Sequence, residues 1–239
     1  VKEPKGESEK YRLKYISGGP LHTAELSLQE AKLELIHFAE ICRNGFTYVR
    51  EAINEQDKEK FDDLNDKLIK YEEITDRIEY EIATYLNEVS KNELSQESSD
   101  KVKAMYKIIG ELESLGDSGE AISRILSRRN IHRKSFDDAT IKKLQDMTDA
   151  VDAAYAAMLH NLEAAHNGTL TDITNAYNAE ERINRLRSNL RDAEIEELEN
   201  DGRYYQTSVY YMDILNALER MGDFIINISQ DLERAYGVK

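Results

Sequence analysis

Apolar residues at every seventh position are the strongest constraint on the fold of this chain. They recur through stretches of roughly thirty residues, which is the spacing of one face of a long α-helix. Three such runs are Leu28, Leu35, Cys42 and Val49, then Leu64, Tyr71, Ile78 and Tyr85, and near the end Tyr211, Leu218, Ile225 and Leu232. Only 2 of the 239 residues are proline, so little in the sequence would break these helices. We therefore expect an all-α protein.

The pattern predicts six helices that are separated by polar or glycine-containing segments. Ser98 or Ser99 is the expected N-cap of the third helix, and Asn167-Gly168 is the expected C-terminal cap of the fourth. Because the joining turns are short, consecutive helices should pack as antiparallel hairpins with crossing angles of about +20°. The expected helices cover residues 22–54, 58–89, 100–127, 138–166, 171–200 and 204–236.

One basic stretch, residues 128–134, interrupts the pattern just past the midpoint of the chain. We interpret it as a linker that pairs with neighbouring acidic residues; contact with an anion or a lipid headgroup is the alternative. The expected architecture is two three-helix bundles in tandem, and a bent six-helix bundle is the alternative. The predicted parts are a polar linker over residues 1–20, a first bundle over 21–130 and a second bundle over 131–239.

The charge of the chain limits what it can bind. Its formal net charge is -15, which argues against binding nucleic acid, an anionic membrane surface or free phosphate on the bare protein surface. Metal cations or basic partners fit this field better. The sequence has no glycine-rich phosphate loop, no Ser-His-Asp arrangement and no Cys/His zinc spacing.

A short sequence motif occurs in two similar copies, 106 residues apart. Residues 111–122 read ELESLGDSGEAI, and residues 217–228 read ALERMGDFIINI. Each copy places two carboxylates four residues apart around a glycine, so both lie on the same face of a helix. The two pairs are Glu113 with Asp117 and Glu219 with Asp223.

The placement of these pairs, more than their spacing, indicates a metal site. Glu72 and Asp76 form a similar pair on the second predicted helix, and each pair starts directly after an apolar-stripe residue, where two helices meet. Gly116 and Gly222 leave room there for a neighbouring backbone or a ligand. Converging carboxylates raise one another's pKa unless a cation joins them, and oxygen ligands suit Mg, Mn, Fe or Ca better than Zn. The spacing alone leaves open the alternative that these carboxylates are solvated and pair with nearby Lys and Arg.

Two segments of the sequence resemble motifs of the PhoU family of bacterial phosphate-signalling proteins. They are LERMGDFIINI at residues 218–228 and YEEITDRIE at residues 71–79. The resemblance runs from about Leu26 to the end of the chain and includes the internal repeat. It implies two three-helix bundles that bind multinuclear metal clusters through Glu/Asp-x-x-x-Asp motifs. Iron is the typical metal of the family, and Mn, Mg, Ni and Zn are the other candidates.

Carried over residue by residue, the resemblance implies two metal sites with one departure. Asn184 stands where a fourth carboxylate of the second site is expected, and an amide oxygen is a neutral and weaker ligand. The second site should therefore be looser, hold fewer metals or be empty. The implied ligands are Glu72, Asp76, Glu113 and Asp117 in the first site, and Glu180, Asn184, Glu219 and Asp223 in the second.

The beginning of the chain implies a partner. Residues 10–16 and 21–35 are similar to the stretch after the last membrane span in proteins of the Na⁺/phosphate cotransporter family, which carry a PhoU-like domain at their cytoplasmic C-terminus. This implies a regulatory domain, not an enzyme, that modulates phosphate uptake at the cytoplasmic face of the inner membrane. Its expected partner is its own transmembrane transporter domain, and a homodimer is the other assembly considered.

Two other functions remain as alternatives. One is a helical scaffold or dimerisation module without metal. The other is a di-iron carboxylate protein, because Glu34/His37 and Glu163/His166 are Glu-x-x-His pairs of the kind that di-iron bundles use. Against it, these pairs are out of register with the internal repeat, and His166 lies at the end of a predicted helix.

Overall fold

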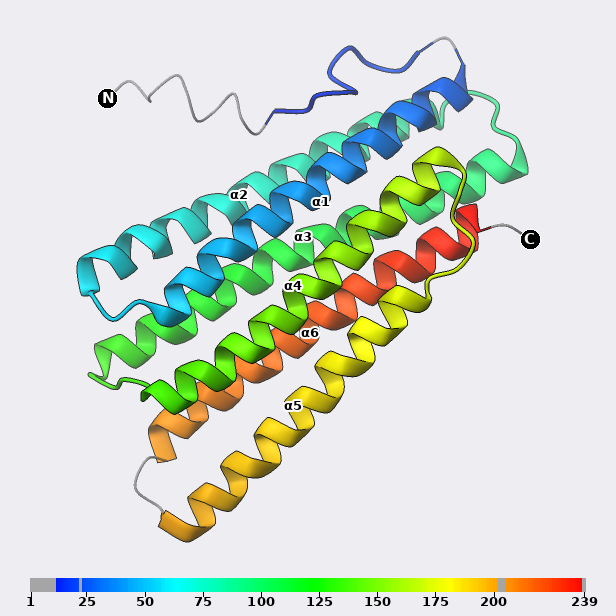
Figure 1. Cartoon of the computed structure of the whole chain (residues 1–239). Coiled ribbons are helices and arrows are strands. Elements are labelled where there is room, and N and C mark those ends of the chain that lie inside the picture. Colours follow the sequence, from blue (N-terminus) through cyan, green and yellow to red (C-terminus); the bar gives the residue numbers. More distant parts are fainter. Residues whose placement is uncertain (1–11, 22, 202–204, 238–239) are drawn as a thin grey trace, which may run out of the picture.

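Six α-helices and no strand make up the described part of the chain, which is residues 12–21, 23–201 and 205–237 of a computed structural model. Consecutive helices run antiparallel and are joined by short connections (Figure 1). The predicted all-α fold is confirmed. The helices are α1 (Ala24–Asn54), α2 (Lys58–Val89), α3 (Gln96–Ile131), α4 (Asp138–Asn167), α5 (Thr174–Asp201) and α6 (Tyr205–Tyr236).

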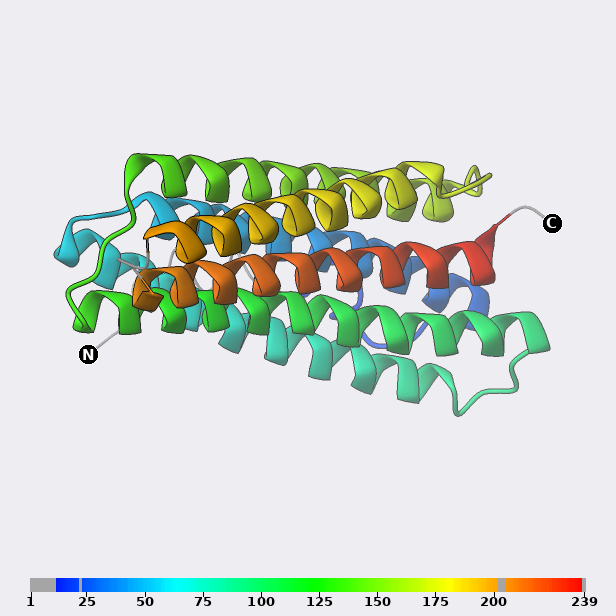
Figure 2. The same ribbon diagram turned by 90° about the horizontal axis from the view of Figure 1, so that it is seen from below.

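The helices form two three-helix bundles that lie side by side. Helices α1, α2 and α3 all pack on one another, and so do α4, α5 and α6. The two bundles meet along α3 and α6 and along α1 and α4. Figure 2 shows the bundles as layers, with α2 and α5 as the outer helices, each in contact only with helices of its own bundle. This is the predicted tandem architecture.

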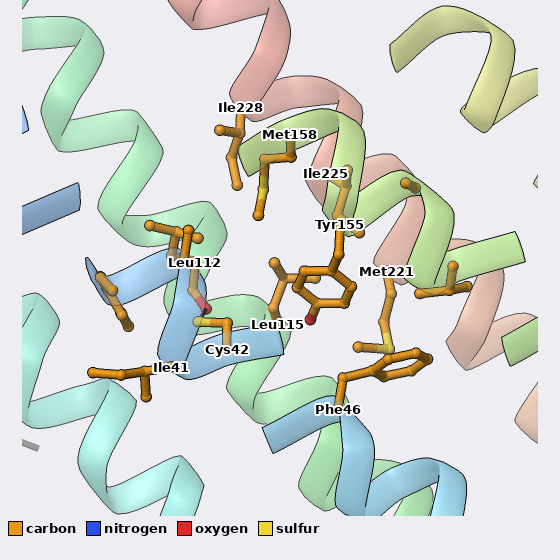
Figure 3. Close-up of a cluster of buried hydrophobic side chains, with 14 of the residues drawn as sticks. Ile41, Cys42, Phe46, Leu112, Leu115, Tyr155, Met158, Met221, Ile225 and Ile228 are labelled. Carbon is orange, nitrogen blue, oxygen red and sulfur yellow. Dashed lines mark hydrogen bonds between the residues drawn. The ribbon is translucent and has the colours of Figure 1, made fainter. Parts of the chain in front are cut away.

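The core is continuous across the two bundles. Apolar side chains from α1, α3, α4 and α6 meet at its centre (Figure 3). Tyr155 is fully buried there. The thiol of Cys42 donates to the carbonyl of Leu112 at 3.3 Å, and burial raises the pKa of this thiol. A thiol that stays protonated is a poor nucleophile, so Cys42 is a packing residue.

The third helix is longer at its beginning than the sequence pattern predicts. Its N-cap is Ser95, whose side-chain oxygen accepts from the backbone N–H of Ser98 at 3.1 Å. The prediction of Ser98 or Ser99 as the N-cap was wrong, because Ser98 is buried inside the first turn. The predicted C-terminal cap of α4 is confirmed, since Gly168 adopts a left-handed conformation with φ of 69°.

The basic stretch is partly helix and partly the connection between α3 and α4, and its predicted pairing with acidic residues was wrong. Residues 128–131 continue α3, and the break falls in residues 132–137. Arg129 is buried, and its guanidinium lies 4.7 Å from the centre of the Phe136 ring. No ion pair of residues 128–134 occurs within the part of the chain that the structure describes. Packing against the aromatic ring, rather than charge pairing, positions this stretch.

Part of the segment that we expected to be a polar linker packs on α1. Ile16 is only 3% exposed, and the backbone N–H groups of Lys14 and Tyr15 donate to the carboxylate of Glu34 at 2.9 and 2.7 Å. Residues 1–11 of that segment lie outside the described residues, as do the predicted first residues of two helices, His22 and Tyr204. No helix within the described ranges is long and apolar enough to span a membrane.

Candidate metal site

The candidate site lies at a close approach of α2 and α3. A Cβ atom added to Gly116 would lie 2.1 Å from Oγ1 of Thr75, so only glycine permits this approach. The Thr75 hydroxyl is itself fixed, since it donates to the carbonyl of Glu72 at 2.8 Å. Gly116 was predicted to admit a neighbouring backbone or a ligand, and the group that it admits is the side chain of Thr75 from the neighbouring helix. The contact brings the acidic residues on either side of Thr75 next to those beside Gly116.

Three carboxylates converge at this contact. Glu72 and Asp76 of α2 and Asp117 of α3 each offer an oxygen, and these oxygens lie within 4.8 Å of one another. Glu72 is partly exposed, and the two aspartates are exposed, so the group is open to solvent. Within the described residues this is the one group of three or more His, Cys, Asp or Glu side chains with such geometry. Glu113, the fourth predicted ligand, lies beside the three rather than among them.

Burial, and then repulsion from neighbouring acids, raises the pKa values of Glu113, Glu72 and Asp117. Burial is the largest cause of the shift for Glu113, and repulsion from Asp117 and Asp76 adds to it, which together raise the pKa of Glu113 to about 7. The pKa values of Glu72 and Asp117 are also raised, by burial first and then by the neighbouring acids. No Lys or Arg forms an ion pair with these four residues in the described part of the chain.

A cation fits these residues. The donors are hard oxygen atoms, their charges repel one another, and the opening to solvent gives an ion a path to them. Glu79 and Glu120, which the sequence pattern did not single out, add to the negative potential by acting on Glu113 and on Asp117 respectively. Their signal was present, because each lies one helical turn after a predicted ligand.

The second predicted site also has a glycine that faces a side chain of the neighbouring helix, but the side chains around it differ. A Cβ added to Gly222 would meet Cδ1 of Ile183 at 3.0 Å, so α5 and α6 also approach closely. The side-chain amide of Asn184 donates to the carboxylate of Glu180, and its own carbonyl oxygen is buried without a hydrogen-bond partner. The carboxylate of Glu180, a predicted metal ligand, is therefore hydrogen-bonded to a neutral amide instead.

The remaining carboxylates of the second site do not gather as those of the first do. Glu180, Glu219 and Asp223 do not form a group with ligand atoms within 4.8 Å, as judged over the described residues. Burial raises the pKa of Asp223, while the positive charge of Arg220 acts to lower it. These residues fit a cation less well than those of the first site.

The two Glu-x-x-His pairs do not form a di-iron site. The carboxylate of Glu34 is occupied by the backbone N–H groups of residues 14 and 15. His166 lies near Lys32, and burial and that charge lower the pKa of its ring. No metal-type group that includes either pair occurs among the residues described. The di-iron alternative therefore has no site in this fold.

A comparison with protein-family models decides the family. The model of the PhoU domain matches residues 35–126 and 156–232, which is more than half of the chain. The chain belongs to the PhoU family. One matched PhoU segment lies in each three-helix bundle, which agrees with the internal repeat of the sequence.

Solved PhoU structures share the fold at low sequence identity. One is PhoU from Pseudomonas aeruginosa, at 14% identity and a TM-score of 0.75, with 88% of this chain and 97% of that chain covered. Another is the phosphate transport system regulatory protein PhoU from Streptococcus pneumoniae, at 16% identity and a TM-score of 0.73, with 89% and 96% covered. A search of curated protein sequences finds no match. At these identities the structural likeness shows the fold alone.

Proposed function

We propose that this chain is a regulatory domain of phosphate transport that binds metal cations on the surface between α2 and α3. The observation that carries the proposal is the convergence of Glu72, Asp76 and Asp117 without an ion pair of their own in the described part of the chain. Membership of the PhoU family supports the phosphate role, and the relative from S. pneumoniae is described as a phosphate transport system regulatory protein. The domain has no catalytic role in this proposal.

Each residue has a distinct part in the proposed site. Glu72, Asp76 and Asp117 would hold the cation, and Glu113 would add a further carboxylate as it loses its proton near neutral pH. Thr75 and Gly116 keep the two helices at the separation that brings these ligands together. A bound cation would supply positive charge that offsets the repulsion of the four carboxylates. Iron is the proposed metal by family resemblance, with Mn, Mg, Ni and Zn as the other candidates.

The proposed partner is the transmembrane domain of a sodium-dependent phosphate transporter. The similarity of residues 10–16 and 21–35 to the segment after the last membrane span of such transporters supports this assignment. The domain would then act at the cytoplasmic face of the inner membrane. A homodimer is the alternative assembly, and light scattering of the purified chain would distinguish a dimer from a monomer.

Metal content per chain tests the proposal. The wild-type chain and the double variant D76N/D117N are depleted with chelator, loaded with Fe, Mn, Mg, Ni or Zn in separate samples, desalted and measured by mass spectrometry of the metal. We expect at least one equivalent in the wild type and a loss to background in the variant. Asp62 and Asp66 lie on α2 outside the group, so D62N/D66N is a control with the same change of charge.

Two results would contradict the metal site. One is a wild-type chain that holds less than one equivalent of any of the five metals. The other is equal metal content in D76N/D117N and D62N/D66N, because binding would then follow net charge rather than this site. Either result would favour the alternative of a helical scaffold without metal.

A further inference from the structure

Each half of the chain contains the same kind of close contact between two helices, at a glycine, which we call a junction. The charged residues around the two junctions differ. The contacts of Gly116 with Thr75 and of Gly222 with Ile183 fix which residues correspond. Six positions around the first junction hold only acids, whereas the same positions around the second hold three acids, an amide, an arginine and an isoleucine. They are Glu72, Asp76, Glu79, Glu113, Asp117 and Glu120 in the first half, and Glu180, Asn184, Arg187, Glu219, Asp223 and Ile226 in the second.

A second arginine enters the second junction at a further position. Arg220 occupies the place that Ser114 has in the repeat, directly after the first acid of the motif. Its charge acts on Asp223. The second junction therefore carries two arginines and three carboxylates, while the first carries six carboxylates at the matched positions. The cation Arg124, which acts on Asp117 in the first half, is already paired with Glu120.

Arg187 also connects the two helices of the second junction. Its Nη2 donates to Oδ1 of Asn216 at 2.9 Å, a hydrogen bond from α5 to α6. The residue of α3 that corresponds to Asn216 is Gly110, and nothing lies within 4 Å of the position of an added Cβ there. The second half thus has a polar bridge between its helices where the first half has open space.

We infer that this chain binds metal in its first half only, and that Arg187 and Arg220 supply in the second half the positive charge that a cation supplies in the first. This rests on the proposed function of the first site. A cation that approached the second junction would meet two guanidinium groups and a carboxylate already bonded to Asn184. Both the repulsion and the missing ligand disfavour its binding.

The internal repeat provides matched variants for the test. E113Q/D117N and E219Q/D223N change the same two positions of the repeat, in α3 and in α6. The full chain is depleted with chelator, loaded with Mn and measured for metal content per chain. We expect E113Q/D117N to lose its metal and E219Q/D223N to keep the wild-type content.

The possible outcomes separate this inference from the proposed function. If E219Q/D223N loses about half of the metal, both halves bind metal, which overturns the inference and leaves the proposed function intact. If the wild type holds no metal, the proposed function fails, and the inference fails with it. Far-UV circular dichroism shows whether each variant is folded, and the two double variants report independently of each other.

A conversion of the second junction tests the role of the arginines directly. The triple variant N184D/R187E/R220S gives the second half the residue types of the first at these positions. We expect its metal content to double relative to the wild type. A folded triple variant with unchanged metal content would show that the arginines are not what keeps metal out. If the triple variant does not fold, the comparison of the two double variants still decides the inference.

Discussion

At the scale of single residues, the two glycines of the repeat have different neighbours and therefore different tolerance. An added Cβ on Gly116 would lie 2.1 Å from Oγ1 of Thr75, a short side chain that is hydrogen-bonded and buried. An added Cβ on Gly222 would lie 3.0 Å from Cδ1 of Ile183, which is the end of a longer side chain. Rotation of the isoleucine can relieve its clash, but the threonine has no such freedom. Both positions are glycine in the sequence, and only the structure shows that their neighbours differ.

Replacing Gly116 with alanine should destabilise the protein by about 1–3 kcal/mol, the usual cost of forcing atoms into a packed contact. The same change at Gly222 should cost less. Gly110 is the control, because it lies in the same helix with nothing within 4 Å of its added Cβ. There alanine should stabilise the helix by about 1 kcal/mol. Urea unfolding followed by circular dichroism measures all three, and equal effects at Gly116 and Gly110 would contradict the packing argument.

Glu113 should make the stability of the metal-free protein depend on pH. Its pKa rises from an ordinary 4.5 to about 7 in the folded state, so the folded chain binds this proton more tightly than the unfolded chain. The stabilising contribution is complete below pH 4.5 and is lost as the pH rises through 7. We expect the melting temperature with chelator present to fall over this window. E113Q should flatten the profile and melt higher than the wild type at pH 8; a lower melting temperature there would contradict this assignment.

At the scale of helices, ion pairs help to fix the contact between α1 and α4. Arg43 donates to both oxygens of Asp152, at 2.9 and 3.0 Å, and Arg50 pairs with Asp149 further along the same helices. The hydrogen bond from Arg43 is the main reason that the pKa of Asp152 is lowered. Two-point contacts of this kind also fix the orientation of the partners. The two bundles are therefore joined by directional polar contacts as well as by apolar packing.

A double-mutant cycle on Arg43 and Asp152 should give a coupling free energy of about 0.5–1 kcal/mol, because the pair is only partly buried. Single changes to R43M and D152N, and the double change, are compared by urea unfolding. Because the pKa of Asp152 is lowered in the folded state, this contribution is present above the ordinary value of 3.8 and is lost at lower pH. A coupling that persists at pH 2 would argue against an ionic contact.

At the scale of the whole molecule, the two bundles share one core. Figure 3 shows side chains from both halves in the same cluster, among them Leu112 and Leu115 of α3 and Met221 and Ile225 of α6. Separating the halves would expose the apolar faces along α3 and α6. The internal repeat alone does not indicate this, because two linked bundles with separate cores would show the same repeat.

The chain should therefore unfold as a single cooperative unit. Far-UV circular dichroism and near-UV tyrosine signals should give the same urea midpoint. The tyrosine signal reports on both halves, because Tyr71 is buried in the first half and Tyr211 in the second. The slope of free energy against urea should be that of the whole chain rather than of half of it. Two separate transitions would show that each bundle is stable without the other.

The elements could be predicted well from the sequence, and their ends less well. The predicted bounds of α2 are those of the structure: Asp57 caps its first turn, and the helix ends at Val89, the last residue of the apolar pattern. The ends of α3 were wrong by about four residues on each side. Ser95 caps it upstream of the pattern, and Arg129 extends it downstream by packing on Phe136. Neither feature belongs to the periodic apolar pattern, so the pattern could not predict these two ends.

The sequence by itself determined the six helices and the acidic positions on them, because helix formation and side-chain direction depend on local spacing. It also placed Gly116 and Gly222 where helices could approach. Only the tertiary structure decided which acids meet, because the separation of two carboxylates on different helices depends on the contact between those helices. At one junction Thr75 and Gly116 bring three carboxylates together. At the other the acids do not gather in this way, and an arginine bridges the two helices instead.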